Sequence, residues 1–354
     1  GQKPRDPKTE QITQFHMDIA SSIQKITEVI MIKLAKDIRN EYGIKNLCLA
    51  GGVALNCVAN GKLLRSGIFE DIFIQPDAGD AGGALGCAYI AWYQHLDNKR
   101  IADGKKDFMN GAYLGPEFSN EEIKKYLDEK NYKYKKLTDD ELPEKIADLI
   151  NEQNVIGWFQ GRMEFGPRAL GGRTIIGDSR SAKTQKTINL KIKYRESFRP
   201  FAPSIREENI SEYFDIDRPS PYMLLVADVS KEKQLPMTEE QESYFGLKKL
   251  NIARSEVPAI THVDYSARIQ SVSKDTNKRY HDMLTVFNEK YGCPVIVNTS
   301  FNVRGEPIVC TPKDAYLCFM RTEMDYLVMN NYLLSKKEQK PLNKDSDWMS
   351  EFEL

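Results

Sequence analysis

Apolar residues near the start of the chain recur at three- and four-residue steps. They are Ile12, Phe15, Ile19, Ile23, Ile26, Ile30 and Leu34. A 3.6-residue period places residues with this spacing on one helix face. The pattern predicts one long amphipathic helix from about Ile12 to Tyr42, ended by Gly43.

The next fifty residues twice show a short apolar run, a glycine-containing turn and a second helical pattern. The first unit is "NLCLAGGVALNCVANGKLL", with its turn at Gly51-Gly52. The second is "DIFIQPDAGDAGGALGCAYIAWY", with a strand predicted at about Ile72 to Ile74. A strand that passes through glycines into a helix N-terminus offers unpaired N–H groups to a nucleotide.

This first region is short of strands for a nucleotide-binding domain. It supplies two predicted strands, whereas such α/β sheets have about five or six. We therefore expect the first domain to be incomplete, with its remaining strands upstream of Gly1.

A polar linker from Gln94 to Asn110 precedes a second set of elements. Ser119 with Glu122 predicts a capping box at a helix start. Further helices are expected at about 140–152, 280–291 and 311–320, and strands at 154–161, 220–229, 267–272 and 294–302. Strands and helices mix without a strict βαβ period, which favours an α/β fold leaning to α+β. The charged segment 230–252 is expected to be a surface insertion, and residues after Lys336 a polar tail.

Composition narrows the class of protein. The 354 residues are 41% hydrophobic and 29% charged, which fits a globular protein of two or three domains. The net charge of -1 provides no global attraction to nucleic acid or to an anionic membrane, so anion binding must come from local clusters. No apolar run approaches the roughly 20 residues of a membrane span, and the six cysteines form no C-x-x-C pair. The expected location is the cytoplasm, with reduced cysteines.

Three basic clusters carry the candidate chemistry. They are "GRMEFGPRALGGR" (Arg162, Arg168, Arg173), "KIKYRESFRPFAPS" (Lys191, Lys193, Arg195, Arg199) and "NTSFNVRGEP" (Ser300, Asn302, Arg304). Arg268 adds a fourth position. Arginine forks with hydroxyl and amide donors suit phosphate oxygens, although solvated surface ion pairs are the alternative for each residue alone.

Candidate metal ligands are few. Asp80 precedes a predicted helix, where a carboxylate can cap N–H groups or hold a cation. The four histidines lack metal-site spacing, and neither a G-x-S-x-G elbow nor a P-loop is present.

Six ordered motifs together carry a family resemblance. They are "CLAGGVALNCVANG", "PDAGDAGGALGCA", "GRMEFGPRALGGRTIIGD", "YRESFRPFAPSI", "ITHVDYSARIQSV" and "NTSFNVRGEPIVCTPKDAYLCFMRTEMDYLVM". From roughly Asp18 to Leu334 the chain resembles the O-carbamoyltransferases of the NodU/CmcH type. The resemblance implies a partial actin-like (sugar-kinase-like) subdomain with its linker at 1–105. A YrdC-like α/β domain would follow at 106–335, and a polar tail at 336–354.

The resemblance also implies an activity. ATP with Mg²⁺ and carbamoyl phosphate would give carbamoyl-adenylate, and the carbamoyl group would pass to a hydroxyl of a small-molecule acceptor. Lys193, Arg195, Ser300 and Asn302 match the YrdC-type catalytic tetrad. The residues expected to bind carbamoyl phosphate or ATP are Arg268, Arg162, Arg168, Arg199, Asn298 and Arg304.

In the actin-like part the resemblance assigns nucleotide binding to Gly51, Gly52 and Asn56, and metal binding to Asp80. The histidines that partner this aspartate in the family do not occur here. A divalent metal, iron or similar, is therefore expected only in a full-length protein.

A second class of function stays open on sequence grounds. The chain could be a nucleotide- or RNA-binding module without transferase activity, although its near-zero net charge argues against nucleic acid. The sequence does not identify the acceptor, and it leaves a homodimer open.

Overall fold

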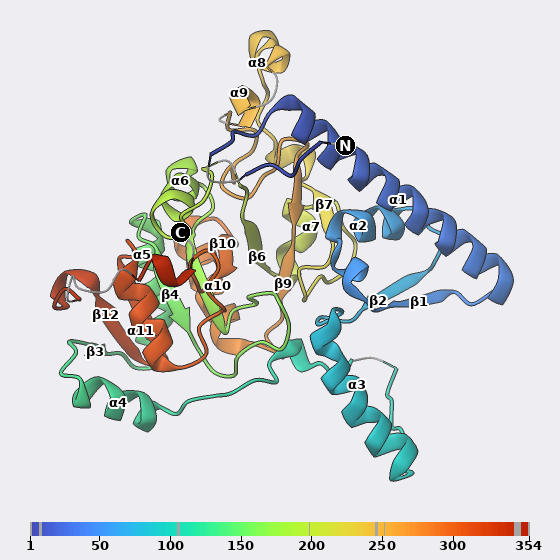
Figure 1. The fold of residues 1–354 in the computed structure, drawn as a ribbon. Helices are drawn as coiled ribbons and strands as arrows, with labels where there is room; N and C mark the ends of the chain where they lie inside the picture. Colours follow the sequence, from blue (N-terminus) through green and yellow to red (C-terminus); the bar gives the residue numbers. More distant parts are fainter. Residues whose placement is uncertain are drawn as a thin grey trace.

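The computed structural model describes residues 2–6, 9–104, 107–197, 199–244, 247–250, 252–342 and 348–352. The expected boundary between 105 and 106 lies outside the described residues, as do tail residues 343–347, 353 and 354. Figure 1 shows a large sheet with flanking helices and, to one side, the first ninety residues with α1, α2 and α3.

An eight-stranded mixed sheet forms the centre of the molecule. Its strand order is β3-β12-β11-β4-β5-β10-β6-β9, in which the β11–β4 and β6–β9 pairs are parallel and the other pairs antiparallel. The strands are β3 (Lys135–Lys136), β4 (Ile156–Phe159), β5 (Arg173–Asp178), β6 (Ala202–Arg206), β9 (Gln270–Val272), β10 (Val295–Ser300), β11 (Tyr326–Met329) and β12 (Tyr332–Ser335). This mixed sheet confirms the α/β fold class.

Two smaller sheets complete the strand inventory of the described residues. Strands β1 (Asn46–Leu49) and β2 (Asp71–Ile74) pair in parallel, and β7 (Val226–Asp228) pairs with β8 (Ser266–Arg268) in antiparallel fashion. The strand expected at 220–229 is thus limited to its last residues, and the strand expected at 267–272 is divided. Its two halves, β8 and β9, belong to different sheets.

The described α-helices have the following bounds. They are α1 (Gln14–Tyr42), α2 (Cys57–Arg65), α3 (Gly83–Ile90), α4 (Asn120–Glu129), α5 (Glu141–Asn151), α6 (Ala182–Lys191), α7 (Ile210–Tyr213), α8 (Glu239–Ser243), α9 (Leu247–Leu250), α10 (Lys278–Tyr291) and α11 (Pro312–Arg321). The predicted stop at Gly43 and the Ser119–Glu122 capping box are both present. The short helices α8 and α9 project from the body, as expected of a surface insertion (Figure 1).

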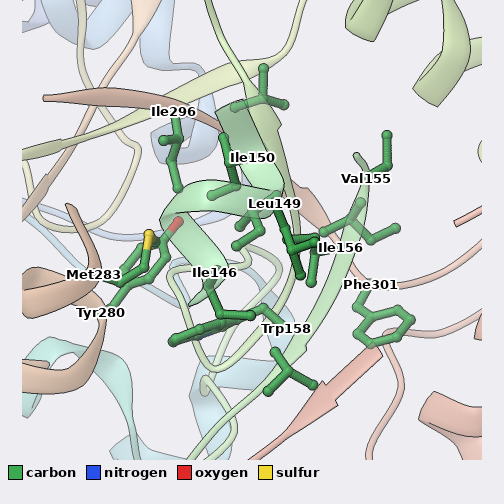
Figure 2. Close-up of a cluster of buried hydrophobic side chains, with 14 of the residues drawn as sticks. Ile146, Leu149, Ile150, Val155, Ile156, Trp158, Tyr280, Met283, Ile296 and Phe301 are labelled. Atoms are coloured by element: carbon green, nitrogen blue, oxygen red, sulfur yellow. The ribbon is translucent and has the colours of Figure 1, made fainter. Parts of the chain in front are cut away.

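The main core lies between the central sheet and helices α5 and α10. Figure 2 shows Ile146 of α5 beside Trp158 of β4, with Tyr280 and Met283 of α10 nearby. The centroids of the Trp158 and Tyr280 rings are 5.7 Å apart. Every residue of β4 and β5 is buried, so these strands lack the in–out alternation that marks a half-exposed strand.

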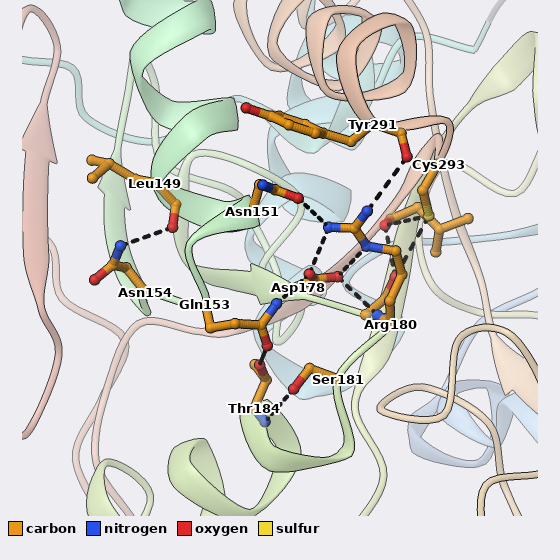
Figure 3. A network of polar contacts seen from close by, with 12 residues as sticks. Leu149, Asn151, Gln153, Asn154, Asp178, Arg180, Ser181, Thr184, Tyr291 and Cys293 are labelled. Atoms are coloured by element: carbon orange, nitrogen blue, oxygen red, sulfur yellow. Dashed lines mark hydrogen bonds and ion pairs between the residues drawn. The ribbon is translucent and has the colours of Figure 1, made fainter.

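A buried ionic network joins α5, β5 and the end of α10 (Figure 3). Asp178 pairs with Arg180 at 2.8 Å, and the Arg180 guanidinium also donates to Asn151 at 2.8 Å. Gln153 donates to the same Asp178 oxygen, Oδ2, at 2.5 Å. Each charge has polar partners, as a buried charge requires, so this network connects helix and sheet.

Helix α1 has an unexpected orientation. Its periodic apolar residues, among them Ile19, Ile23 and Leu34, are exposed, whereas Glu28 and Ala35 are buried on the face that contacts α2. Glu28 forms an ion pair with Lys62 of α2 at 2.5 Å.

Helix α2 connects the first ninety residues to the rest of the protein. The Asn60 amide donates to the Leu224 carbonyl at 3.1 Å, and Arg65 donates to the Val226 carbonyl at 2.7 Å. This contact brings the N-terminal end of α2 to the end of the central sheet where the candidate site lies.

Candidate functional site

An arginine-rich hollow of about 420 Å³ lies where β10 ends and β6 begins, facing β8 and the start of α2. We call it the arginine hollow. Its lining includes Arg168, Arg195, Arg199, Arg268, Asn298 and Ser300, six of the residues expected to bind or act on phosphorylated substrates. The structure therefore brings together side chains from four separate sequence segments.

Lys193 lies behind the wall of this hollow, with 3% of its surface exposed. Its ammonium donates to the Ser300 hydroxyl at 3.2 Å and to the Asn302 side-chain oxygen at 2.7 Å, and also to the Ser300 backbone carbonyl. The Ser300 hydroxyl in turn donates to Asn302 at 2.7 Å. Burial lowers the pKa of Lys193 to about 7, so its charge depends on what occupies the hollow.

The four arginines of the hollow repel one another. Burial and the nearby Arg268 charge lower the pKa of Arg168 to about 10. Burial and the nearby Arg199 charge likewise lower the pKa of Arg195 to about 10. The lining residues include no carboxylate. Glu196, just outside the lining, pairs with Arg199 at 3.0 Å, and no ion pair is found for Arg168, Arg195 or Arg268 in the described structure. Such convergent cations contribute little to folding, and an anion between them would relieve the repulsion.

Rigid elements hold the arginines and the amide in place. Arg195 donates to Asn189 at 2.7 Å and lies 5.1 Å from the Phe201 ring centroid. Asn298, on β10, donates to Gln270 at 2.7 Å and to the Ala169 carbonyl, while its own side-chain oxygen is buried without a hydrogen-bond partner in the described structure. The site is therefore organised before any ligand binds.

The three arginines of "GRMEFGPRALGGR" have three different environments. Arg168 lines the arginine hollow, whereas Arg162 lines a second hollow on the other side of this loop. Arg173 is fully buried, lies 3.6 Å from the Phe159 ring centroid and donates to the carbonyls of Gln160, Gly161 and Pro116. In the described structure its side chain therefore fixes the backbone segments that carry these carbonyls.

Arg304 is exposed on the loop after β10 and is not among the residues that line the arginine hollow. Together with Arg162 it is a predicted anion-binding residue that the structure does not bring into the hollow. Both were predicted because they lie close in sequence to other basic or polar candidates, but their loops direct these two side chains away from the hollow.

Cys57 and His262 are two lining residues with ionisable side chains that the sequence prediction did not include. Cys57 is the first residue of α2, and its thiol partly offsets the lowering of the Arg268 pKa by burial. His262 also lines the hollow, and burial together with Arg268 lowers its pKa below the usual value. His262 belongs to the motif "ITHVDYSARIQSV", which was the one signal that could have indicated it.

Gly51, Gly52 and Asn56, which were expected to bind nucleotide, take part in the local fold of the first ninety residues. Gly51 has a φ of 102° and donates its N–H to the Ala78 carbonyl at 2.6 Å. Gly52 begins the short helix that precedes α2. The Asn56 side chain caps α2 by accepting from the Ala59 N–H and exchanges hydrogen bonds with Gln24.

Asp80 is exposed at the start of the short helix 80–82, whose N-cap is Gly79. Across the described ranges, no group of three or more histidine, cysteine, aspartate or glutamate side chains is arranged to hold a metal. The residues present therefore do not form a metal centre around Asp80. Nor does any described helix have the length and apolar character needed to cross a membrane.

Comparison with known families identifies the class of protein. The model for the carbamoyltransferase C-terminus matches residues 147–336, and the model for the carbamoyltransferase N-terminus matches residues 3–89. The chain belongs to the carbamoyltransferase family. Its arginine hollow is lined mainly by residues of the C-terminal match, with Cys57 and Val58 from the N-terminal match.

Individual relatives support this assignment. The chain is 58% identical over 353 residues to an uncharacterised protein of Synechocystis, covering 99% of this chain and 57% of that one. It is 38% identical to the nodulation protein NolNO of Sinorhizobium fredii, covering 95% and 46%. It is 32% identical to 3'-hydroxymethylcephem-O-carbamoyltransferase of Amycolatopsis lactamdurans, covering 80% and 47%. The chain thus spans about half the length of these relatives.

Proposed function

We propose that the arginine hollow binds carbamoyl phosphate and ATP and forms carbamoyl-adenylate, from which a carbamoyl group passes to a hydroxyl of a small molecule. The observation that carries the proposal is the convergence of four arginines, Lys193 and Ser300 on one site, where Glu196 forms an ion pair with only one of the arginines, Arg199. Two phosphorylated substrates repel each other, and convergent cations offset that repulsion. An RNA-binding role has less support, because the cations converge on a hollow instead of following a surface stripe.

The proposed chemistry has two steps in the hollow. Water releases inorganic phosphate from carbamoyl phosphate and leaves carbamate. A carbamate oxygen then attacks the α-phosphorus of ATP, and the bond to pyrophosphate breaks. Arg168, Arg195 and Arg268 would stabilise the negative charge on the departing phosphate groups. The hydroxyl of Ser300 and the amide of Asn302 would orient the carbamate.

Transfer completes the reaction. An acceptor hydroxyl oxygen attacks the carbamoyl carbon, AMP leaves with the electrons of the broken bond, and the hydroxyl proton passes to a base. The name of the Amycolatopsis relative specifies such an O-carbamoyl transfer for that protein. For this chain the acceptor is proposed only as a small hydroxyl compound.

Magnesium would enter with ATP. Because the arginine hollow has no lining carboxylate, the nucleotide phosphates themselves would hold the ion there. We derive no step through iron, since the described residues near Asp80 do not form a centre for it.

The test is ATP–pyrophosphate exchange measured with and without carbamoyl phosphate. The proposal predicts exchange only when carbamoyl phosphate is present, because carbamate is the nucleophile. Ser300→Ala should slow exchange by about tenfold or more, the effect of one lost transition-state hydrogen bond. Ser243→Ala, on exposed helix α8, is the matched control. Exchange that is absent, or that proceeds equally without carbamoyl phosphate, would overturn the proposal.

A further inference from the structure

A second hollow, of about 450 Å³, lies between the end of β4, the start of α10, the β11–β12 turn and the start of α4. Six of its lining side chains are amides: Asn110, Asn120, Gln160, Asn277, Asn330 and Asn331. We call it the amide hollow. None of its lining residues is shared with the arginine hollow.

We propose that the amide hollow binds a neutral polyhydroxylated molecule of the saccharide class. A hydroxyl both donates and accepts a hydrogen bond, and a side-chain amide offers one group of each kind. Rows of amides therefore match neighbouring hydroxyls of a sugar ring. An anion, in contrast, needs donors alone, as the arginine hollow supplies them.

The charges at the amide hollow balance, which favours a neutral ligand. Arg279 is paired with Asp139 at 2.6 Å, and Arg162 lies 3.7 Å from Glu117. Both cations thus have a carboxylate partner. The lining offers no cluster of like charge to attract an ion.

The amides are held in fixed positions. Gln160 and Asn331 are each 5% exposed, and their side-chain oxygens accept from Arg279 at 3.0 and 3.4 Å. Asn120 donates to Asn331 at 3.0 Å, and its own side-chain oxygen is buried without a hydrogen-bond partner in the described structure. A hydroxyl donor inside the hollow would satisfy that oxygen after a small rotation of the amide.

Turn geometry places two of the asparagines at the amide hollow. Asn110 and Asn330 have φ values of 48° and 45°, in the left-handed region that asparagine adopts more readily than other non-glycine residues. Asn330 lies in the turn between β11 and β12, and both asparagines are among the residues that line the hollow.

Saccharide binding can be tested by saturation-transfer NMR followed by calorimetric titration. The probes are neutral mono-, di- and trisaccharides of glucose, galactose, mannose and N-acetylglucosamine, with glucose 6-phosphate as the anionic comparison. We expect at least one neutral saccharide to bind. Its affinity should change by less than about twofold between about 50 and 500 mM salt, because screening weakens only charge interactions.

Two variants locate the site. Asn120→Ala removes an amide that faces its neighbour Asn331, and Asn110→Gly removes another while preserving the positive φ. Each should weaken saccharide binding by about tenfold, the value of one hydrogen bond of about 1.4 kcal/mol. Asn288→Ala, on α10 but outside the hollow, is the matched control and should leave affinity unchanged.

The proposal is overturned if no neutral saccharide binds the wild-type chain, if binding survives both variants, or if glucose 6-phosphate binds more tightly and with strong salt dependence. Carbamoyl phosphate titrated into the same variants keeps the two proposals separate. Asn120→Ala should leave that binding unchanged, because carbamoyl phosphate belongs to the arginine hollow. Failure of carbamoyl phosphate to bind would contradict the proposed function and leave the saccharide result standing.

Discussion

Lys193 shows how a single residue can link ligand binding to protonation. Its ammonium is enclosed by oxygens of Ser300 and Asn302, yet burial lowers its pKa to about 7. In the unfolded chain the pKa returns to about 10.5, so between these values the unfolded state holds more protons. This residue therefore makes the free energy of unfolding rise with pH across that window. Phosphate groups bound in the hollow would raise the pKa of Lys193, since a nearby anion favours the charged amine.

Proton uptake on binding follows from this pKa. At pH about 8 the ligand-free amine is mostly neutral, so carbamoyl phosphate binding should take up close to one proton; at pH about 6 uptake should nearly vanish. Titration calorimetry in buffers of different ionisation enthalpy measures this number. Lys193→Met should abolish the uptake. Lys336→Met removes a partly buried lysine, with a pKa of about 8 but outside the hollow, and should retain the uptake. Equal uptake in Lys193→Met would show that another group titrates.

Residue chemistry from the sequence predicted several of the side chains that the structure brings together at the arginine hollow. Lys193, Arg195, Ser300 and Asn302 are up to 109 positions apart, and only the family resemblance linked them before the fold was known. Arg162 and Arg173 show the limit of that approach. Both share a motif with Arg168, but the direction of each side chain depends on loop geometry that no spacing rule specifies.

At the scale of elements, the loop from Gly161 to Arg173 separates the two hollows. Its buried carboxylate, Glu164, accepts backbone N–H bonds from Leu170 at 2.6 Å, from Gly172 at 2.7 Å and from Arg173 at 3.1 Å. This one side chain fixes the loop that carries Arg162 to one side and Arg168 to the other.

Glu164→Gln should therefore destabilise the fold. The amide has one acceptor oxygen and replaces the other with a donor that faces backbone N–H groups, so the free energy of unfolding should fall by about 1–3 kcal/mol. Glu117→Gln, an exposed neighbour of the same loop, should change it by less than about 0.5 kcal/mol. Denaturant unfolding measures both. Equal effects would mean that the N–H contacts of Glu164 contribute little to stability.

Helix α2 depends on a glycine for its close approach to β7. A Cβ added at Gly61 would lie 2.3 Å from the Val226 carbonyl oxygen, whereas a Cβ at Gly86 in α3 would meet nothing within 4 Å. Gly61→Ala should thus destabilise by about 1–3 kcal/mol through overpacking. Gly86→Ala should stabilise by up to about 1 kcal/mol through helix propensity. The opposite signs are measurable by thermal unfolding, and stabilisation by both substitutions would contradict the packing of α2 on β7.

Element prediction succeeded where periodicity or a cap was strong and missed two strands, β5 and β6, that flank β10 in the centre of the sheet. Helices α1, α5 and α10 and strands β4 and β10 were expected near their observed positions. Strands β5 and β6 were not, because β5 is buried on both faces and begins inside an arginine motif, and β6 contains Pro203. The division of 267–272 into β8 and β9 depends on long-range pairing that local sequence does not encode.

At the scale of the whole molecule, two hollows of opposite chemistry lie on either side of one loop. The arginine hollow combines α2 of the first ninety residues with β6, β8 and β10, so the contact between the N-terminal and C-terminal family regions contributes directly to the site. The amide hollow is built without residues of the N-terminal match. Charge separates the two sites: the arginine hollow has an excess of cations over carboxylates, and the amide hollow has paired charges and amides.

The central claim is that the arginine hollow is a site for phosphorylated carbamoyl substrate. Calorimetric titration of carbamoyl phosphate into the wild-type chain, Arg268→Ala and Arg218→Ala tests it most directly. Arg218 pairs with Asp71 on the surface and does not line the hollow, so its removal should change affinity by less than about twofold. Arg268→Ala should weaken binding by about tenfold or more with an unchanged thermal midpoint, because a charged hydrogen bond is worth about 1.5–3 kcal/mol. Equal affinity in Arg268→Ala and the wild-type chain would contradict the assignment of this hollow.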